Sequence, residues 1–218
     1  MASINDLNDF FNKEEDKNNI FIFTHASRIK CIMNELFGYS FKKENNLKNL
    51  DIISITKKEE NISIYRTNFS DISNLDIKNI DTQSNSFSKS QNVDFNKLIN
   101  DYNIFIIRHG FAYHNKLKDK YKNNKIKAIR IKLIEMKENT ELVDHGITES
   151  NKSGKNFQKF YDLKKQKNYI FISDLKRTFQ TFEYFFYGTY LQDKTKTETE
   201  TETETEIENT TFKYLNNC

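Results

Sequence analysis

Proline is absent from the sequence, and cysteine is nearly so. The two cysteines, Cys31 and Cys218, have no C-x-x-C spacing and no secretory context, so the sequence indicates neither a disulfide framework nor a zinc site. The lack of proline accompanies heavy use of Asn, Lys and Ile. Nucleotide bias in a genome produces this pattern as readily as structural need does, so we draw no functional conclusion from it.

A long hydrophobic run and a strong net charge are also missing. Nowhere do about eighteen uncharged apolar residues follow one another, and the acidic opening MASINDLNDFFNKEEDK has no apolar signal-peptide core. We therefore expect a soluble, cytoplasmic protein with no membrane partner. The 34 basic and 31 acidic side chains give a formal charge of only +3, which speaks against nucleic acid as a partner. Any anion site must be local.

Apolar runs bounded by polar turns predict the strands of the fold, at residues 20–24, 52–56, 62–67, 103–108 and 169–173. Three of these runs, IFIFTH, IFIIRH and YIFISD, are apolar on both faces, which is typical of parallel strands covered by helices on both sides. Helical spacing follows these strands. A chain of 218 residues suits one domain, so we predict a single α/β domain, a three-layer sandwich with a mainly parallel sheet.

The other segments predict a hairpin, a helix start and polar connections. The runs IISIT and ISIYR, joined by KKEEN, predict an antiparallel hairpin at the edge of the sheet. Asp144 and Thr148 predict a helix start, with one of them as the cap. Residues 70–95 are rich in Ser, Asn and Asp and predict a loop or linker. The alternating Thr and Glu of residues 194–206 predict a disordered or solvated segment, because neither face is apolar.

Side chains able to handle phosphate follow the three doubly apolar strands. His25, His109 and Arg177 lie at or just beyond the predicted strand ends, where open parallel sheets bind their ligands. Together with Arg108 they make a cationic site of the size of a phosphate. An arginine fork can hold two phosphate oxygens at once. A neutral imidazole can attack phosphorus through one ring nitrogen when a hydrogen bond holds the other.

Four blocks of the sequence resemble the histidine phosphatase superfamily, the phosphoglycerate mutase-like proteins. RHGFAYHN is similar to the Arg-His-Gly signature of that family. DHGITESNKSG is similar to its Asp-x-x-Leu-Thr-x-x-Gly segment, with Ile147 for the Leu and Asn151 for the Gly. SDLKRTFQT matches the Ser-x-Leu-x-Arg-[Ala/Thr]-x-Gln-Thr segment at every fixed position, and FIFTHASRIKCI resembles the block that supplies the second histidine.

The order of these blocks differs from the order in the family. There the second-histidine block lies near the C-terminus and a short hairpin follows it, whereas here it comes first, followed by the hairpin of residues 50–68. The resemblance therefore implies a circularly permuted, phosphoglycerate mutase-like domain spanning residues 1–218. Its parts would be the second-histidine part (1–69), a polar linker between the old ends (70–100), the Arg-His-Gly part (101–191) and a low-complexity Thr/Glu segment (192–211).

The resemblance also implies roles for six residues. His109 would be the nucleophile that becomes phosphohistidine, and His25 would stabilise the transferring group. The implied phosphate-binding residues are Arg108, Arg177, Asn115 and Gly110. No metal or cofactor is implied. The expected partner is a phosphorylated small molecule or a phosphoprotein, and the oligomeric state stays open.

Two classes of function remain open. The first is a phosphomonoesterase, a hydrolase acting through phospho-His109, with a phosphomutase as a variant that needs a second phosphate position. The second is a catalytically impaired relative that binds phosphorylated ligands. Many members take a general acid from the segment after the Arg-x-x-Gln-Thr helix, where Glu206 and Glu208 are available here but unassigned. Ala26 excludes the His-Asp acid-phosphatase variant, and we interpret His114 and His145 as structural.

Overall fold

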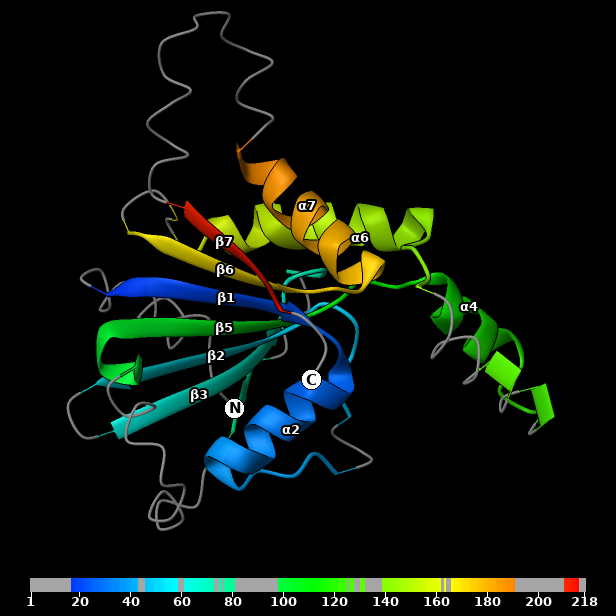
Figure 1. The fold of residues 1–218 in the computed structure, drawn as a ribbon, viewed down its shortest axis with the longest axis horizontal. Helices are drawn as coiled ribbons and strands as arrows, with labels where there is room; N and C mark the ends of the chain where they lie inside the picture. The colour runs from blue at the N-terminus through cyan, green and yellow to red at the C-terminus, as the bar shows by residue number, and fades with distance from the viewer. Residues whose placement is uncertain are drawn as a thin grey trace, which may run out of the picture.

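The computed structural model describes residues 17–42, 46–58, 61–72, 75, 77–80, 98–124, 126–127, 130–131, 139–161, 163, 166–190 and 210–215. Within these residues seven strands form one sheet in the order β4-β3-β2-β5-β1-β6-β7 (Figure 1). Their bounds are β1 Asn18–Thr24, β2 Asp51–Lys58, β3 Asn61–Asn68, β4 Lys78–Asn79, β5 Tyr102–Arg108, β6 Asn168–Ser173 and β7 Thr210–Leu215.

The sheet is mixed rather than mainly parallel. Strand β1 runs parallel to β5 and β6, and β7 runs parallel to β6. The predicted hairpin of β2 and β3 is confirmed, and β2 pairs antiparallel with β5. Strand β4 adds a further antiparallel pair beyond β3, so the hairpin is not the outermost part of the sheet. The α/β class is confirmed, whereas the prediction of a mainly parallel sheet holds only for the half formed by β5, β1, β6 and β7.

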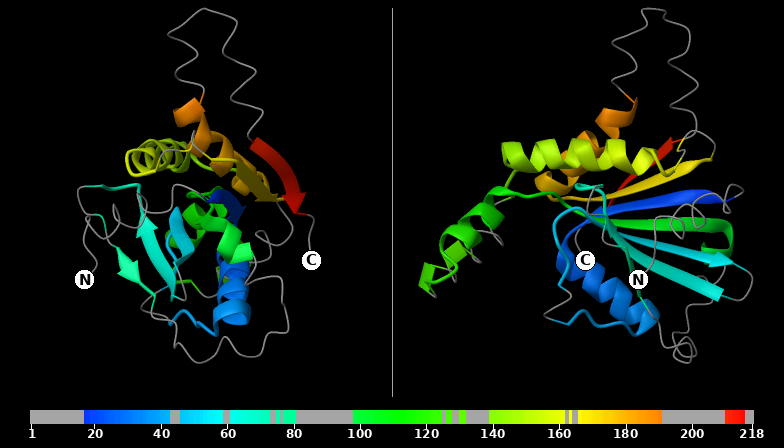
Figure 2. Two further views of the ribbon diagram at one scale, coloured as in Figure 1. Left: turned by 90° about the vertical axis from the view of Figure 1, so that its left-hand side faces the viewer. Right: turned by 180° about the vertical axis from the view of Figure 1, so that it is seen from behind.

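Helices cover both faces of the sheet (Figures 1 and 2). Helix α2 (Ala26–Phe37) packs on one face, and α6 (Asp144–Gln158) and α7 (Lys176–Tyr190) pack together on the other. Helix α4 (Tyr113–Lys120) extends away from the sandwich (Figure 1). Within the described residues, every helix is too short or too polar to span a lipid bilayer.

The strands that are apolar on both faces contribute side chains to two separate cores, one on each face of the sheet, as their sequences predict. In β1, Phe21 and Phe23 point toward α6 and α7, while Ile20 lies in the cluster around α2. In β5, Phe105 stacks on Phe21 with ring centroids 4.9 Å apart. Successive side chains of a strand point to opposite faces, so a strand with helices on both sides needs apolar residues at nearly every position.

Helices α2 and α6 show how the ends of the helices are fixed. Helix α2 ends in the left-handed Gly38, whose N–H donates to the carbonyl of Asn34 at 2.9 Å. Helix α6 begins at Asp144 as predicted, but its N-cap is Val143, so the prediction that Asp144 or Thr148 caps it is wrong. The Thr148 hydroxyl instead donates to the Asp144 carbonyl one turn earlier, at 3.0 Å.

Two elements were not expected from the sequence. Strand β4 lies inside the predicted 70–95 linker, and Ile77 and Ile80 on either side of it are buried, so this part of the linker is packed. Strand β7 follows the Thr/Glu tract and pairs with β6 along its whole length, which includes residues 210 and 211 of the predicted low-complexity segment. Residues 194–206 and 81–97 lie outside the described residues.

Helix α6 has glycine at two close contacts, one with α7 and one with the turn after β5. A Cβ atom on Gly154 would lie 1.8 Å from the carbonyl oxygen of Phe185 in α7. A Cβ atom on Gly146 would lie 2.1 Å from the carbonyl oxygen of Phe111. Both obstacles are backbone atoms, which cannot rotate away as a side chain can.

We therefore expect Gly154→Ala to force α6 and α7 apart. The free energy of unfolding should fall by about 1–3 kcal/mol or more, the range for overpacked cores, although alanine is the better helix former. Chemical denaturation with far-UV circular dichroism measures the change. Lys152→Ala, at an exposed position of the same helix, is the control and should leave stability nearly unchanged. Equal stability of Gly154→Ala and wild type would contradict this close packing.

Candidate active site

The carboxyl ends of the parallel strands bring the predicted histidines together. Thr24 at the end of β1 pairs with Arg108 at the end of β5, and the N–H of His109 donates to the Thr24 carbonyl at 3.0 Å. His25 and His109 therefore follow directly on neighbouring strand ends at one edge of the sheet. Strand β6 ends at the same edge and leads into α7, which supplies Arg177.

His109 is buried and held in one tautomer. Its Nδ1 lies 2.8 Å from the carbonyl oxygen of Gly110, and its Nε2 receives a hydrogen bond from Nε of Arg177 at 3.3 Å. A carbonyl oxygen only accepts, so Nδ1 carries the ring proton. The Arg177 guanidinium only donates, so Nε2 presents its lone pair. Nε2 is thus the ring nitrogen without a proton.

The surroundings keep this imidazole neutral. Burial, followed by the charges of Arg177 and Arg108, lowers the pKa of His109 well below its usual range. The hydrogen bond to the Gly110 carbonyl acts in the opposite direction and is outweighed. A neutral ring beside two guanidinium groups leaves the site with excess positive charge, which suits an incoming anion.

Helix α7 positions Arg177 beside His109 and also holds the turn after β5 by a hydrogen bond. The hydroxyl of Thr181 accepts the N–H of Gly110 at 2.8 Å and donates to the carbonyl of Arg177 at 2.6 Å. The side-chain oxygen of Gln180 accepts the N–H of Leu142 at 2.7 Å. The Arg, Gln and Thr of the SDLKRTFQT segment therefore each have a contact in the site or in the loops around it.

His25 is the N-cap residue of α2, directly after the end of β1. It is half-buried, and its Nδ1 lies 2.7 Å from the hydroxyl of Ser27. Its backbone is extended and precedes the first helical turn, so the free N–H groups of α2 begin beside it. The structure thus places the second predicted histidine at a helix N-terminus, which favours anions.

The loop before β2 fastens the turn from the other side. Arg108 donates to the carbonyl of Leu47, and the N–H of Leu50 donates to the carbonyl of Arg108 at 3.2 Å. The side-chain nitrogen of Asn49 lies 2.7 Å from the Gly110 carbonyl and 3.2 Å from that of His109. Asn49 is a site residue that the sequence analysis missed, because an Asn in a polar loop carries no pattern.

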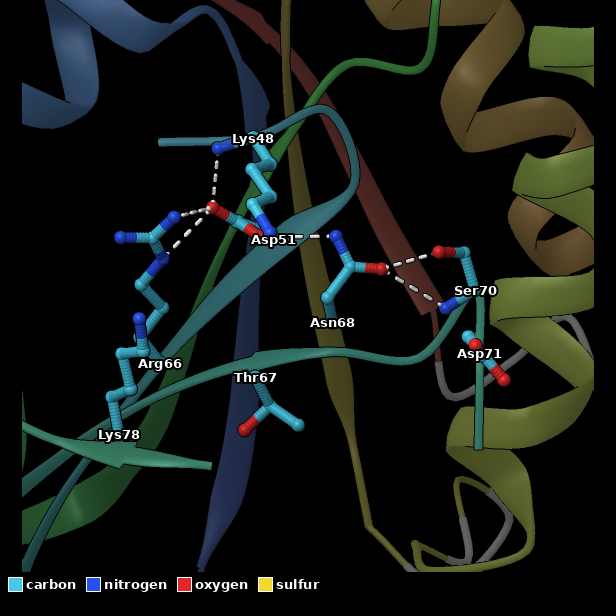
Figure 3. Close-up of a pocket in the computed structure, with 8 residues that line it drawn as sticks. All are labelled: Lys48, Asp51, Arg66, Thr67, Asn68, Ser70, Asp71 and Lys78. Atoms are coloured by element: carbon cyan, nitrogen blue, oxygen red, sulfur yellow. Dashed lines mark hydrogen bonds and ion pairs between the residues drawn. The ribbon is translucent and has the colours of Figure 1, made fainter. Parts of the chain in front are cut away.

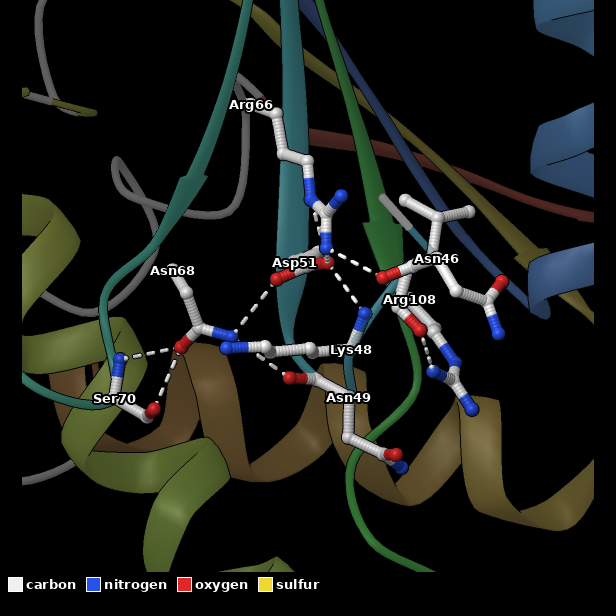
Figure 4. Close-up of polar contacts among 9 residues, drawn as sticks. Asn46, Lys48, Asn49, Asp51, Arg66, Asn68, Ser70 and Arg108 are labelled. Atoms are coloured by element: carbon white, nitrogen blue, oxygen red, sulfur yellow. Dashed lines mark hydrogen bonds and ion pairs between the residues drawn. The ribbon is translucent and has the colours of Figure 1, made fainter. Parts of the chain in front are cut away.

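A buried ion pair holds this loop in place. The Oδ2 atom of Asp51 lies 2.6 Å from Nη2 and 2.8 Å from Nε of Arg66, and it accepts the N–H of Lys48 at 2.5 Å (Figure 4). Asn68 donates to Oδ1 of Asp51 at 3.0 Å. Burial raises the pKa of Asp51, while Arg66 and these hydrogen bonds oppose the rise. Pairs of this kind are costly to break from one side.

A cavity of about 270 Å³ lies against this ion pair (Figure 3). Its walls combine three cationic and two carboxylate side chains with three neutral polar ones, namely Lys48, Asp51, Arg66, Thr67, Asn68, Ser70, Asp71 and Lys78. His25, His109, Arg108 and Arg177 do not line it. The cavity therefore borders the supporting loop rather than the histidines.

Gly110 and Asn115, predicted to bind phosphate, have structural partners. A Cβ atom on Gly110 would lie 2.7 Å from the Ser150 hydroxyl and 3.1 Å from the carbonyl of Gly146, so α6 needs a glycine there. The Oδ1 atom of Asn115 accepts the N–H of Ala112 at 3.0 Å. Gly110 thus has a packing reason for its missing side chain, and Asn115 shapes the turn after it, while phosphate binding by both stays a prediction.

The two remaining histidines differ in their surroundings. His114 is buried, its Nδ1 lies 2.9 Å from the Thr140 hydroxyl, and its ring centroid is 5.5 Å from that of His109. His145 is exposed on α6, with Nε2 3.3 Å from the carboxylate of Glu149. His114 is thus a direct neighbour of His109, whereas the ring of His145 lies 6.3 Å from that of Phe111. Glu206 and Glu208, the available acids, lie outside the described residues.

Comparison of the chain with protein-family models, with curated proteins and with solved structures finds no match. Within the part of the chain that the structure describes, no cluster of His, Cys, Asp and Glu side chains has the composition of a metal centre.

The lowered pKa of His109 makes a prediction about stability. The unfolded chain takes up a proton on this histidine below about pH 6.5, while the folded protein does not until the pH reaches its lower folded pKa. Between these two values the free energy of unfolding should fall as the pH falls, by at most about 1.4 kcal/mol per pH unit from this group.

We expect His109→Gln to flatten that slope between about pH 7 and pH 5, measured by urea unfolding at each pH. His145→Gln, which removes the exposed histidine of α6, should keep the wild-type slope because His109 is intact. If wild type and His109→Gln lose stability with the same pH dependence, His109 is not held neutral by the fold.

Proposed function

We propose that this chain is a phosphomonoesterase that works through a phosphohistidine on His109. One observation carries the proposal: a buried imidazole whose Nδ1 is bonded to a carbonyl and whose Nε2 faces the guanidinium of Arg177. This is a neutral nitrogen nucleophile beside a group that binds phosphate oxygens. The low pKa of His109 supports it, because a protonated ring cannot attack.

The reaction proceeds in two displacements. When the Nε–H of Arg177 turns from His109 Nε2 to a phosphoryl oxygen, the freed lone pair of Nε2 forms a bond to phosphorus as the bond between phosphorus and the ester oxygen breaks. That oxygen leaves with the bonding electrons and takes a proton from solvent. A water molecule then attacks phosphorus and releases one proton to solvent, the N–P bond returns its electrons to Nε2, and inorganic phosphate leaves. Arg108 and Arg177 neutralise the charge on the phosphoryl oxygens in both steps, and His25 stabilises the group in transfer.

The charge balance of the site favours a phosphate dianion as ligand. The two groups that lower the pKa of His109 through their charges most strongly are Arg177 and Arg108, both permanently cationic. Two negative charges on a phosphomonoester match these two positive charges. The natural ligand is then a phosphorylated small molecule or a phosphoprotein.

The arrangement of the strands supports a permuted, phosphoglycerate mutase-like domain. The strand before His25 lies beside the strand before His109, although the second-histidine block comes first in the chain. The hairpin of β2 and β3, which the family resemblance expects after that block, pairs with the other side of β5. Spatial neighbours thus agree with the resemblance where the chain order departs from it, as a circular permutation requires.

His109→Ala should abolish hydrolysis of an activated aryl phosphate such as 4-nitrophenyl phosphate, because it removes the atom that forms the intermediate. Arg108→Ala, Arg177→Ala and His25→Ala should each raise the activation barrier by about 2–4 kcal/mol, the scale for losing one preorganised charge. Steady-state kinetics measure these losses. Arg130→Ala, which removes an exposed arginine on another part of the chain, is the matched control and should keep wild-type activity.

Trapping the intermediate tests the chemistry directly. Phosphohistidine is labile to acid, so alkaline quenching during turnover should preserve labelled protein and acid quenching should lose the label. Label on serine or cysteine, or full activity of His109→Ala, would refute the mechanism. Phosphate binding at Arg108 and Arg177 without turnover would favour the impaired relative, and transfer of the phosphoryl group to a second substrate would favour the mutase.

A further inference from the structure

We propose that Asn49 is a positioning residue of this site, which holds the Gly110 carbonyl where it fixes the nucleophilic tautomer of His109. The inference rests on the proposed role of His109 as the nucleophile. Asn49 comes from the loop before β2, 60 positions away from His109 in the chain. No motif of the sequence includes it.

Three oxygen atoms lie within hydrogen-bond distance of the side-chain nitrogen of Asn49. It lies 2.7 Å from the Gly110 carbonyl, 3.2 Å from the His109 carbonyl and 3.3 Å from Oδ1 of Asn115. The Asn115 oxygen is itself an acceptor, because it receives the N–H of Ala112 at 3.0 Å. An amide NH2 group has two donors and suits such a cluster of acceptors, whereas an oxygen there would be repelled by all three.

The Gly110 carbonyl links Asn49 to the nucleophile. This oxygen accepts from Asn49 on one side and from Nδ1 of His109, 2.8 Å away, on the other. Without Asn49 the carbonyl loses its nearest side-chain donor and can turn away from the ring. The Arg177 bond to Nε2 then has to hold the tautomer without this carbonyl, so a fraction of the protein can carry the ring proton on Nε2, which removes the lone pair that attacks phosphorus. Together with Arg177, the amide of Asn49 therefore favours the reactive tautomer through one intervening group.

Several contacts fix the backbone of the loop that carries the Asn49 amide. Leu50, the next residue, is buried in the left-handed conformation with φ of 62°, a strained state for a side chain with a Cβ. Asn68 donates to the carbonyl of Asn49 at 2.9 Å and to Asp51 at 3.0 Å, so the ion pair of Asp51 and Arg66 clamps the same backbone (Figure 4). A strained backbone persists only where its surroundings over-determine it.

The test compares Asn49→Ala and Asn49→Asp with wild type. In 15N-labelled protein, ring-nitrogen shifts, assigned by comparison with His109→Gln, should show His109 protonated on Nδ1 in wild type. In Asn49→Ala a second population protonated on Nε2 should appear. The kcat for the aryl phosphate should fall about 10- to 100-fold with KM nearly unchanged, the scale known for outer residues that orient a reactive or ligating side chain without touching the substrate. Asn49→Asp should lose more, because a carboxylate replaces the donor among three oxygens.

Asn156→Ala is the matched control. Its side chain also donates to a buried backbone carbonyl, that of Phe69 at 2.7 Å, but from α6 and away from His109. It should lose stability like Asn49→Ala yet keep the wild-type ring shifts and kcat. If Asn49→Ala folds with wild-type ring shifts, or if Asn156→Ala changes them equally, Asn49 has only a structural role.

The ring shifts also separate this inference from the proposed function. They report the tautomer of His109 whether or not the protein hydrolyses phosphate. A wild-type ring protonated on Nε2 would overturn the positioning role of Asn49. A ring protonated on Nδ1 only while Asn49 is present, in a protein that forms no phosphohistidine, would support the positioning and refute the phosphatase. If Asn49→Asp fails to fold, Asn49→Ala alone carries the comparison.

Discussion

The parallel pairing of β1 with β5 is the contact on which the rest of this structure depends. It runs from Asn18 opposite Tyr102 to Thr24 opposite Arg108, and the N–H of His109 extends it by one more bond. A shift of one residue would send Phe21 and Phe23 to the opposite face and separate the two histidines. Because both strands are buried on both sides, the cores around α2 and around α6 and α7 fix the same register.

The site that results combines buried side chains with positive charge. Arg177 and His109 are both buried, and an ionised imidazole beside a guanidinium would be repelled as well as poorly solvated. The fold resolves this by keeping the ring neutral and by tying its Nδ1 proton to the Gly110 carbonyl. The excess positive charge is then available to an anion. Electrostatics, more than any one contact, is what connects this fold with the phosphate chemistry proposed above.

Three segments distant in sequence meet at the turn after β5. Thr181 of α7 holds the N–H of Gly110, Asn49 of the loop before β2 holds its carbonyl, and Ser150 of α6 leaves no space for a side chain there. Each support comes from a different element, so the turn is fixed from several directions. In the permuted relationship proposed above, such a site does not depend on chain order, since it needs only the same neighbours in space.

The sequence by itself determined the parts of this protein that follow from local pattern. The strands ending at Thr24, Arg108 and Ser173 are apolar at nearly every position, and the helices after them have their own periodicity, so the elements and the edge carrying His25, His109 and Arg177 could be predicted. Tertiary structure alone decided the antiparallel pairings of β2 with β5 and of β4 with β3, the pairing of β7 with β6 and the role of Asn49. A short strand such as β4 or β7 depends on its partner for its hydrogen bonds, and a polar loop residue such as Asn49 acquires its role only from the carbonyl groups that the fold brings to it.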